Sequence, residues 1–191
     1  MKRLTGYTLV LGLLALAALT VTQAQPSPPP VGSDAPGFTL TNLDGEPVAL
    51  QALTREGPVV LVVLRGYPGY QCPICSTQVA GYITQRHAFV DHGARVLFVY
   101  PGPRGDLDAR AREFIRGRNW PANFELVTDP GYAMVKAYGL RWNAHRETAY
   151  PSTFIIDDSG TIRYAKVSTT HAGRLPASGA LAELDTLADV R

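Results

Sequence analysis

Cysteine is scarce in this sequence, which has only two among its 191 residues. A framework of disulfide bridges therefore cannot hold the fold together, because such frameworks need several pairs. A structural zinc site normally takes four ligands, often from two Cys-X-X-Cys pairs, and no second pair is present here. The two cysteines are better suited to chemistry than to holding the chain together.

The sequence also lacks a large excess of charge of either sign. The chain has 18 basic and 16 acidic residues and no basic run, so nothing in it indicates a nucleic-acid partner. Its N-terminal apolar stretch, Tyr7 to Val21, has about 15 residues, whereas a membrane-spanning helix needs about 20. These absences favour a globular protein with no nucleic-acid partner and no stable membrane insertion after signal cleavage.

The N-terminus has the pattern of a cleaved secretion signal. Lys2 and Arg3 precede the apolar stretch, and small residues at 22–24 follow it. We predict that residues 1–24 are removed and that the protein is periplasmic or secreted. Their removal takes away two basic and no acidic residues, so that 18 basic and 16 acidic residues become 16 and 16.

The remaining chain is long enough for one domain with a sizeable core. It starts with a segment, 25–36, that contains five prolines, and this composition predicts a stiff linker. We expect the folded domain over residues 37–191.

Apolar runs and turn residues predict strands that alternate with helices. We expect hairpins over 38–50 and 152–167, strands over 58–64, 94–100 and 124–127, and helices from the cysteines to near Gly93 and over 106–118, 132–138 and 180–190. This order predicts an α/β fold with a central mixed β-sheet flanked by helices.

Cys72 and Cys75 form a Cys-Pro-Ile-Cys motif where the first buried strand passes into its helix. Catalytic sites of open α/β sheets favour such strand ends. The pair closes almost no loop, so it contributes little as a structural bridge, but it can form and reopen a disulfide. In the first turn of a helix, free N–H groups and the helix dipole stabilise a thiolate. We therefore predict a redox role.

From about Val31 to its end, the chain resembles the thioredoxin superfamily and, within it, the peroxiredoxin-like AhpC/TSA redoxins. Besides the cysteine motif, three segments carry the resemblance: Val-Gly-Ser-Asp-Ala-Pro-Gly-Phe-Thr-Leu at 31–40, Val-Lys-Ala-Tyr-Gly at 135–139, and Tyr-Pro-Ser-Thr-Phe-Ile-Ile-Asp at 150–157. Their shared order and spacing imply a thioredoxin-like fold with an N-terminal β-hairpin extension.

The resemblance allows two roles for the same cysteines. In a thioredoxin-type pair, Cys72 is the nucleophile and Cys75 the resolving thiol, and the substrate is a protein thiol or disulfide. In the peroxiredoxin pattern Pro-x-x-x-Thr-x-x-Cys, which 68–75 resembles, Cys75 holds the peroxidatic position and the substrate is a hydroperoxide. Both routes end in a Cys72–Cys75 disulfide, and both imply an external thiol reductant and no bound cofactor.

Pro151 favours the first route. Peroxiredoxins place an arginine at this point, so a peroxidase would need an arginine from elsewhere in the chain. Pro151 instead resembles the cis-proline of thioredoxin-type oxidoreductases, which leaves backbone groups free for a substrate peptide. We therefore expect an extracytoplasmic thiol-disulfide oxidoreductase, with a thiol peroxidase as the alternative.

Two further residues are candidates for shaping the site. Arg65 either favours a thiolate through its fixed charge or is a solvated charge at the strand end. Tyr70, with Tyr67, either forms an apolar rim for the substrate or packs against the core.

A copper carrier is the last alternative, because two thiolates and an imidazole suit copper. His171 lies in the half of the chain that would supply the third ligand. The copper proteins that this chain resembles space their cysteines by three residues, so we assign no metal. We expect the other histidines, His87, His92 and His145, at the surface.

Overall fold

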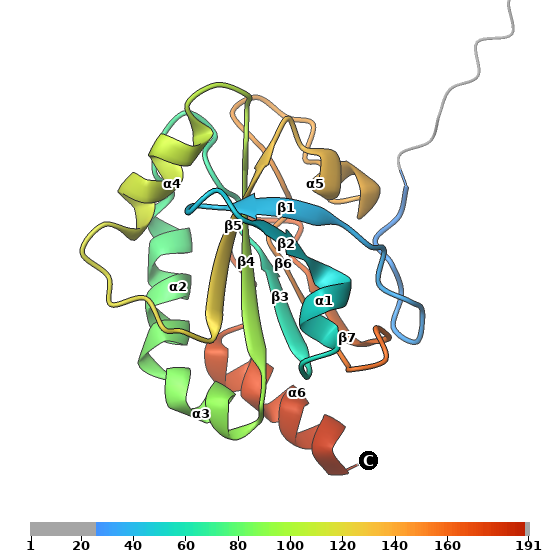
Figure 1. The fold of residues 1–191 in the computed structure, drawn as a ribbon. Coiled ribbons are helices and arrows are strands. Elements are labelled where there is room, and N and C mark those ends of the chain that lie inside the picture. Colours follow the sequence, from blue (N-terminus) through green and yellow to red (C-terminus); the bar gives the residue numbers. More distant parts are fainter. Residues whose placement is uncertain (1–25, 190–191) are drawn as a thin grey trace, which may run out of the picture.

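The structure is a computed structural model that describes residues 26–189 (Figure 1). The predicted signal peptide therefore lies outside the described residues. Within residues 26–189, no helix has both the length and the apolar character needed to cross a membrane.

Seven strands of the described chain form one mixed sheet in the order β2-β1-β5-β4-β3-β6-β7. The strands are β1 (Thr39–Asn42), β2 (Pro47–Ala49), β3 (Val59–Val63), β4 (Arg95–Gly102), β5 (Phe124–Pro130), β6 (Ser152–Ile156) and β7 (Ile162–Val167). The helices are α1 (Leu50–Thr54), α2 (Pro73–Thr84), α3 (Arg86–Asp91), α4 (Leu107–Ile115), α5 (Ala133–Ala137) and α6 (Ala177–Asp189).

The centre of the sheet is parallel and its two sides are antiparallel. β3 pairs in parallel with β4, and β4 with β5, whereas β6 runs antiparallel to β3 and β7 antiparallel to β6. Val63, the last residue of β3, lies opposite Ser152, the first residue of β6. The chain that leaves β3 and the chain that enters β6 therefore meet at one edge of the sheet.

Helices cover both faces of the sheet (Figure 1). All five residues of β3 are buried, as expected for a strand between two layers. Val60 and Val62 pack in the core under α2, α3, α4 and α6, and Val59 and Leu61 pack in the core under α1 and α5. This division follows from the alternation of side chains along a strand.

Aromatic side chains fill the larger core. Tyr82 stacks on Phe89 with ring centroids 5.4 Å apart and meets Phe98 edge to face at 5.6 Å. Each such fully buried side chain stabilises the fold by about 1.5–3 kcal/mol relative to an exposed one. The helix that carries the cysteines is thus fixed on the sheet by its own Tyr82.

The predicted helix from the cysteines to Gly93 is in fact two helices. Gln85, with φ −99° and ψ 18°, ends α2 and precedes α3. The short helix α1 after β2 is a further difference, because the hairpin prediction absorbed its first residue, Leu50. The β1–β2 hairpin is confirmed, and β1 also joins the main sheet through β5.

The proline-rich segment packs on the domain over its described residues, 26–36. The Gly32 and Ala35 N–H groups donate to the carbonyls of Ile162 and Gly160, at 2.8 and 2.9 Å. Near its start, the Pro26 carbonyl lies so close to Gly139 that a Cβ there would be 2.0 Å from it. The described part of the segment therefore contacts the domain after α5, near Gly139, and at the start of β7.

Candidate active site

Cys72 is the N-cap residue of α2, and its extended backbone has φ −82° and ψ 110°. Its sulfur accepts a hydrogen bond from the Cys75 N–H at 3.3 Å, much as a serine or aspartate oxygen does at a helix start. Pro73, which has no N–H, occupies the first helical turn where no donor is needed. Both thiols are free and buried, with Cys72 3% and Cys75 0% exposed.

The two thiols differ in acidity. A hydrogen bond from the Cys75 thiol lowers the pKa of Cys72 to about 5 against the opposing effect of burial, and the Cys75 N–H and two arginines, Arg174 and Arg65, act in the same direction. Burial raises the pKa of Cys75 well above 9.0. At neutral pH, Cys72 is therefore the thiolate and Cys75 the thiol that supports it.

Arg174, from the loop between β7 and α6, lies across both sulfurs. Its Nη1 is 3.4 Å from Cys75 Sγ, and its Nη2 is 3.9 Å from Cys72 Sγ. Nη1 also donates to Gln78 Oε1, and Nε donates to the His171 carbonyl, each at 3.0 Å. These bonds fix a permanent positive charge beside the reactive sulfur.

The turn between β3 and α2 is fixed by two residues. Gly66 has φ +70°, and a Cβ on it would lie 1.9 Å from the Pro101 carbonyl oxygen, so no larger residue fits. Gln71 accepts from Tyr100 Oη at 2.8 Å and donates to the Arg110 carbonyl at 2.9 Å. The start of α2 is therefore held against β4 and α4.

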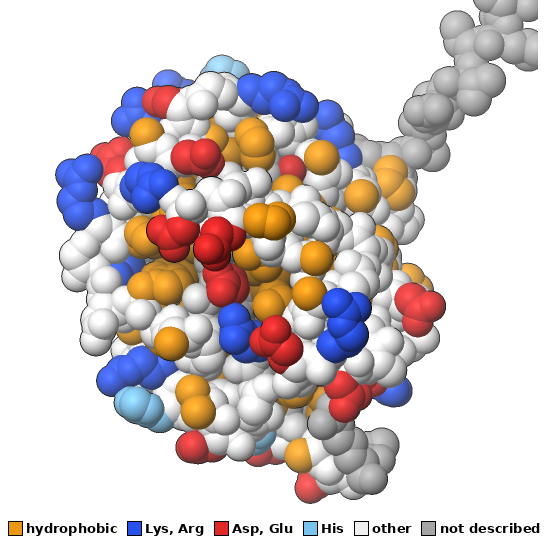
Figure 2. Space-filling view, in the orientation of Figure 1, with side chains coloured by type: hydrophobic (Ala, Val, Ile, Leu, Met, Phe, Trp, Pro, Cys, Tyr) orange, Lys and Arg blue, Asp and Glu red, His pale blue; other side chains and the backbone are white. Residues whose placement is uncertain are grey.

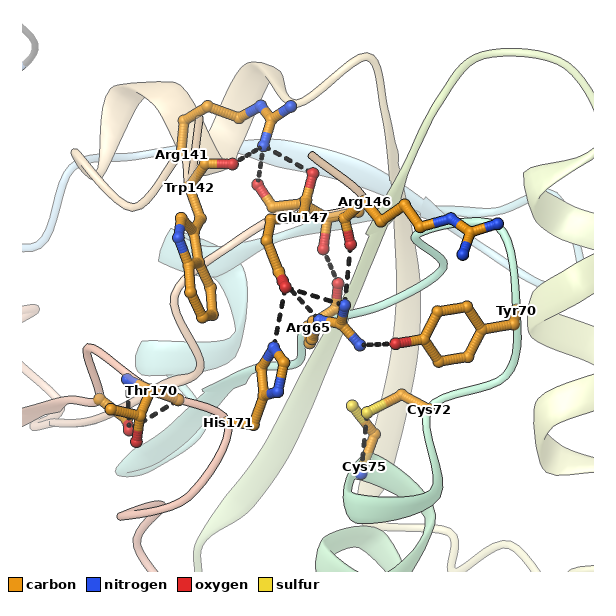
Figure 3. Close-up of polar contacts among 12 residues, drawn as sticks. Arg65, Tyr70, Cys72, Cys75, Arg141, Trp142, Arg146, Glu147, Thr170 and His171 are labelled. Carbon is orange, nitrogen blue, oxygen red and sulfur yellow. Dashed lines mark hydrogen bonds and ion pairs between the residues drawn. The ribbon is translucent and has the colours of Figure 1, made fainter. Parts of the chain in front are cut away.

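Arg65 is buried at the end of β3 and is 3% exposed, so it is not a solvated charge. Nε and Nη2 donate to the two carboxylate oxygens of Glu147 at 2.5 and 3.0 Å (Figure 3). Nη2 also donates to the Arg146 carbonyl at 2.8 Å, and Nη1 donates to Tyr70 Oη at 2.7 Å. Its charge makes a small contribution to the lowered pKa of Cys72.

Glu147 joins Arg65 to the loop that carries Arg174. The His171 Nε2–H donates to Glu147 Oε1 at 2.8 Å, and the His171 ring lies 5.2 Å from that of Trp142 (Figure 3). Burial opposes ionisation of Glu147, but the hydrogen bonds from Arg65 and His171 lower its pKa overall. Glu147 is therefore a carboxylate at neutral pH that bridges two segments.

Pro151 does not have the backbone geometry that its sequence context predicts. No peptide bond between residues 26 and 189 is cis, so the expected cis-proline is wrong. Pro151 is buried, and its carbonyl accepts from the Ser168 N–H at 2.9 Å. The register of the sheet accounts for this bond: Ser152 lies opposite Val167, so the Ser168 N–H reaches the carbonyl of Pro151 one position further on. The carbonyl of Pro151 is therefore bound by the chain's own backbone.

The copper alternative gains no support. Among residues 26–189, no three His, Cys, Asp or Glu side chains gather in a way that could hold a metal ion. His171, the expected third ligand, bonds to Glu147 instead. His87 and His145 are exposed as predicted, and His92 is half-buried, 3.3 Å from Asp185.

A groove of about 280 Å³ runs beside the cysteine motif. Ile74, which is 44% exposed, and Gly81 line it from α2, and Leu175 and Pro176 line it from the loop before α6. Arg174 both lines the groove and contacts the two sulfurs, whereas neither cysteine lines it. Tyr70, 43% exposed, lies on the Arg65 side of the motif.

A larger hollow of about 640 Å³ lies away from the cysteines. It is lined by the β1–β2 turn and by residues of and after α4, among them Leu43, Ile115 and Trp120. Figure 2 shows this face of the molecule, where hydrophobic side chains lie between acidic and basic ones. None of the residues that contact the sulfurs lines this hollow.

Arg174 and Glu147 did not emerge from the sequence. Arg174 is 99 residues from Cys75, and Glu147 is 82 residues from Arg65. Both lie in loops without a motif, so no local pattern marks them. The only available signal was the absence of an arginine at position 151, which implies that a peroxidase must recruit one from another segment.

Similar proteins were found in three comparisons. The AhpC/TSA family profile matches residues 31–165. The putative peroxiredoxin Q, chloroplastic, of Oryza sativa subsp. indica is 30% identical over 133 residues, which are 70% of this chain and 57% of that protein. The putative peroxiredoxin bcp of Haemophilus influenzae is 29% identical over 142 residues, 71% of this chain and 84% of that protein. The match thus spans little more than half of the rice relative.

Solved structures share the fold. Peroxidoxin BcpB from Mycobacterium tuberculosis has a TM-score of 0.67 at 21% identity and covers 84% of this chain and 97% of its own. The peroxiredoxin-like protein from Aquifex aeolicus has a TM-score of 0.69 at 18% identity, with 85% and 90% covered. At these identities the likeness shows the fold, which confirms the predicted thioredoxin-like class. The AhpC/TSA profile matches well over half of the chain, so this chain belongs to the AhpC/TSA family.

Proposed function

We propose that this protein is a thiol-dependent peroxidase that reduces a hydroperoxide with Cys72 and Cys75 and is regenerated by an external thiol reductant. The observation that carries the proposal is Arg174, which lies across the sulfurs of an acidic thiol and its partner. The names of the similar proteins, which are peroxiredoxins, support the same class of oxidoreductase. Disulfide exchange was the first expectation from the sequence because Pro151 resembles a cis-proline, and the bond before Pro151 is not cis.

The first step is attack of the Cys72 thiolate on the hydroperoxide. A sulfur–oxygen bond forms and the oxygen–oxygen bond breaks, so the sulfur becomes a sulfenic acid and the peroxide is reduced. The other oxygen leaves as an alkoxide or hydroxide and takes a proton from water. Arg174 donates hydrogen bonds toward the oxygens on which negative charge develops, which lowers the barrier.

The second step regenerates a stable form of the enzyme. The Cys75 thiol attacks the sulfur of the Cys72 sulfenic acid, a disulfide forms, and the hydroxyl group leaves with the thiol proton as water. Cys72 is the N-cap residue of α2 and Cys75 lies in its first turn, so no distant segment has to move. A thiol reductant then opens the disulfide by exchange.

We assign the attack to Cys72 although Cys75 stands at the peroxidatic position of the family pattern. Cys75 is fully buried and burial raises its pKa, so it is a thiol at neutral pH. Cys72, at the N-cap, has a pKa lowered to about 5 and is the thiolate. Because the thiolate is the nucleophilic form, the electrostatics favour Cys72.

The test is stopped-flow oxidation of the reduced protein by hydrogen peroxide. We expect thiol loss to be orders of magnitude faster than for free cysteine at the same thiolate concentration. Cys75→Ser should keep the fast phase and stop at a sulfenic acid that dimedone traps, whereas Cys72→Ser should lose it. A reaction no faster than free cysteine would contradict the peroxidase. A fast phase kept by Cys72→Ser and lost by Cys75→Ser would move the attack to Cys75.

Thiol–disulfide exchange through the same pair is the second candidate. It is favoured by the low pKa of Cys72 beside a protonated Cys75, which suits formation and resolution of a mixed disulfide. The two candidates separate in an insulin reduction assay run beside the peroxide reaction. Rapid insulin reduction with slow oxidation by peroxide would favour exchange.

A further inference from the structure

Arg174 can act on the cysteines only if the loop that carries it is held in place. This loop, 168–176, begins where the Ser168 N–H donates to the Pro151 carbonyl at 2.9 Å. Toward its middle, the His171 side chain bonds to Glu147 at 2.8 Å, and the His171 carbonyl accepts from Arg174 Nε at 3.0 Å. His171 is thus tied to the rest of the domain by its ring and to Arg174 by its backbone.

Glu147 is a firm anchor for this tie. Its carboxylate is bound by both Arg65 Nε and Nη2, and its side chain is 10% exposed. The segment around it is held by Arg141, whose Nη1 donates to the carbonyls of Glu147 and Thr148 at 3.0 and 2.6 Å. A continuous series of contacts therefore runs from Arg65 through Glu147 and His171 to the guanidinium over the sulfurs.

We propose that Glu147 and His171 are positioning residues that place Arg174 over Cys72 and Cys75, and that they thereby set the acidity of Cys72. Neither residue needs to touch a sulfur. The consequence for the rate with hydroperoxide rests on the function proposed above, whereas the consequence for thiol acidity does not.

The direction in which Glu147→Gln shifts the pKa of Cys72 distinguishes a positioning role of Glu147 from a direct effect of its charge. Glu147 compensates the charge of Arg65, which itself favours the Cys72 thiolate. If Glu147 acted only through its charge, Glu147→Gln would leave Arg65 uncompensated and lower the pKa of Cys72. If Glu147 holds the Arg174 loop, the same substitution releases Arg174 and the pKa of Cys72 rises.

The experiment measures the pH dependence of Cys72 alkylation by iodoacetamide, with mass spectrometry to identify the modified cysteine. We expect His171→Ala to raise the pKa of Cys72 by about one unit, which lowers the thiolate fraction about tenfold at acid pH. His171→Gln keeps an N–H donor of similar reach and should restore most of the acidity. His145→Ala, an exposed histidine on the neighbouring loop, is the matched control and should change nothing.

A double-mutant cycle then tests whether His171 acts through Arg174. We expect His171→Ala to have no further effect on alkylation once Arg174→Ala is present. Additive effects, an unchanged pKa in His171→Ala, or a lowered pKa in Glu147→Gln would each overturn the inference. Thermal unfolding of every variant identifies any loss of fold.

The same variants distinguish this inference from the proposed function, because alkylation requires no peroxide. A raised pKa with no fast peroxide reaction in the wild type would uphold the positioning role and contradict the peroxidase. A fast peroxide reaction in the wild type with an unchanged pKa of Cys72 alkylation in His171→Ala would support the peroxidase and contradict the positioning role.

Discussion

At the scale of the residue, the two cysteines show how a shift of one helical turn changes a thiol. Cys72 caps α2 and its sulfur receives the N–H and the S–H of Cys75. Cys75 lies inside the turn, where burial raises its pKa and the hydrogen bond that its S–H donates to Cys72 raises it further. The same side chain is therefore an anion at one position and a neutral donor at the other.

The pH dependence of Cys72 reactivity follows from this difference. The folded pKa of Cys72 lies below that of an ordinary thiol, so the reactive thiolate predominates above about 5 and is lost as the pH falls through that value. Alkylation of Cys72 should show this midpoint, while Cys75 stays unmodified at neutral pH. A midpoint for Cys72 near that of free cysteine, about 8.5, would be inconsistent with the hydrogen bonds described.

Arg174 should affect both acidity and rate. In Arg174→Ala, loss of the positive charge raises the pKa of Cys72, and loss of the donor slows the peroxide reaction roughly 10²-fold even when corrected for thiolate. Arg174→Lys keeps the charge but not the planar fork, so it should restore acidity better than rate. Stopped-flow oxidation across pH measures both. Arg116→Ala, an exposed arginine next to α4, is the control and should match the wild type.

At the scale of the element, the β3–α2 turn sets where the cysteines lie. Gly66→Ala would place a Cβ 1.9 Å from the Pro101 carbonyl oxygen at φ +70°. Left-handed strain and overpacking together should cost about 2–4 kcal/mol of the free energy of unfolding, measured by urea denaturation. A loss of less than about 1 kcal/mol in the free energy of unfolding is what surface substitutions usually cause, and it would show that the turn can move. Gly45→Ala, at φ +88° with open space around it, is the control for strain without contact.

The groove beside α2 should influence which hydroperoxides react. A Cβ on Gly81 meets no atom within 4 Å, so Gly81→Leu can fill the groove without a clash. We expect cumene hydroperoxide to react several-fold more slowly with this variant, while hydrogen peroxide reacts as before. Ala80→Leu adds the same side chain on an exposed position of α2 and should leave both rates unchanged. Equal slowing of both peroxides by Gly81→Leu would mean that the groove is not the substrate path.

At the scale of the whole molecule, the sheet brings three distant segments to one edge. The β3–α2 turn supplies Arg65 and the cysteines, the loop before β6 supplies Glu147, and the loop after β7 supplies Arg174. Their meeting depends on the order β3-β6-β7 at this side of the sheet. The site is therefore a property of the assembled sheet and not of any one element.

We also propose that the domain works outside the cytoplasm after removal of residues 1–24. When the full chain is expressed in a Gram-negative host, we expect the periplasmic fraction to contain a shortened protein. Its intact mass should correspond to a chain that begins near Gln25. A chain that lacks residues 2–24 should stay in the cytoplasm. An uncleaved chain in the cytoplasm would contradict this proposal.

The sequence by itself determined most of the order of the elements, the fold class and the position of the two cysteines. These are local properties: apolar runs mark β3 and β4, turn residues mark the hairpins, and Cys72 and Cys75 lie two residues apart. The break at Gln85 was missed because α2 and α3 continue one apolar pattern, and α1 was missed because five residues carry too little pattern.

Only the tertiary structure decided which residues surround the sulfurs. Arg174 meets Cys75 across 99 residues, and Glu147 meets Arg65 across 82, so no window of sequence contains either pair. Pro151 had the sequence context of a substrate-binding proline, but the register of β6 and β7 gave its carbonyl to Ser168. Strand register is set by packing across the whole sheet, and it is this register that pairs Pro151 with Ser168 and brings an arginine to the cysteines.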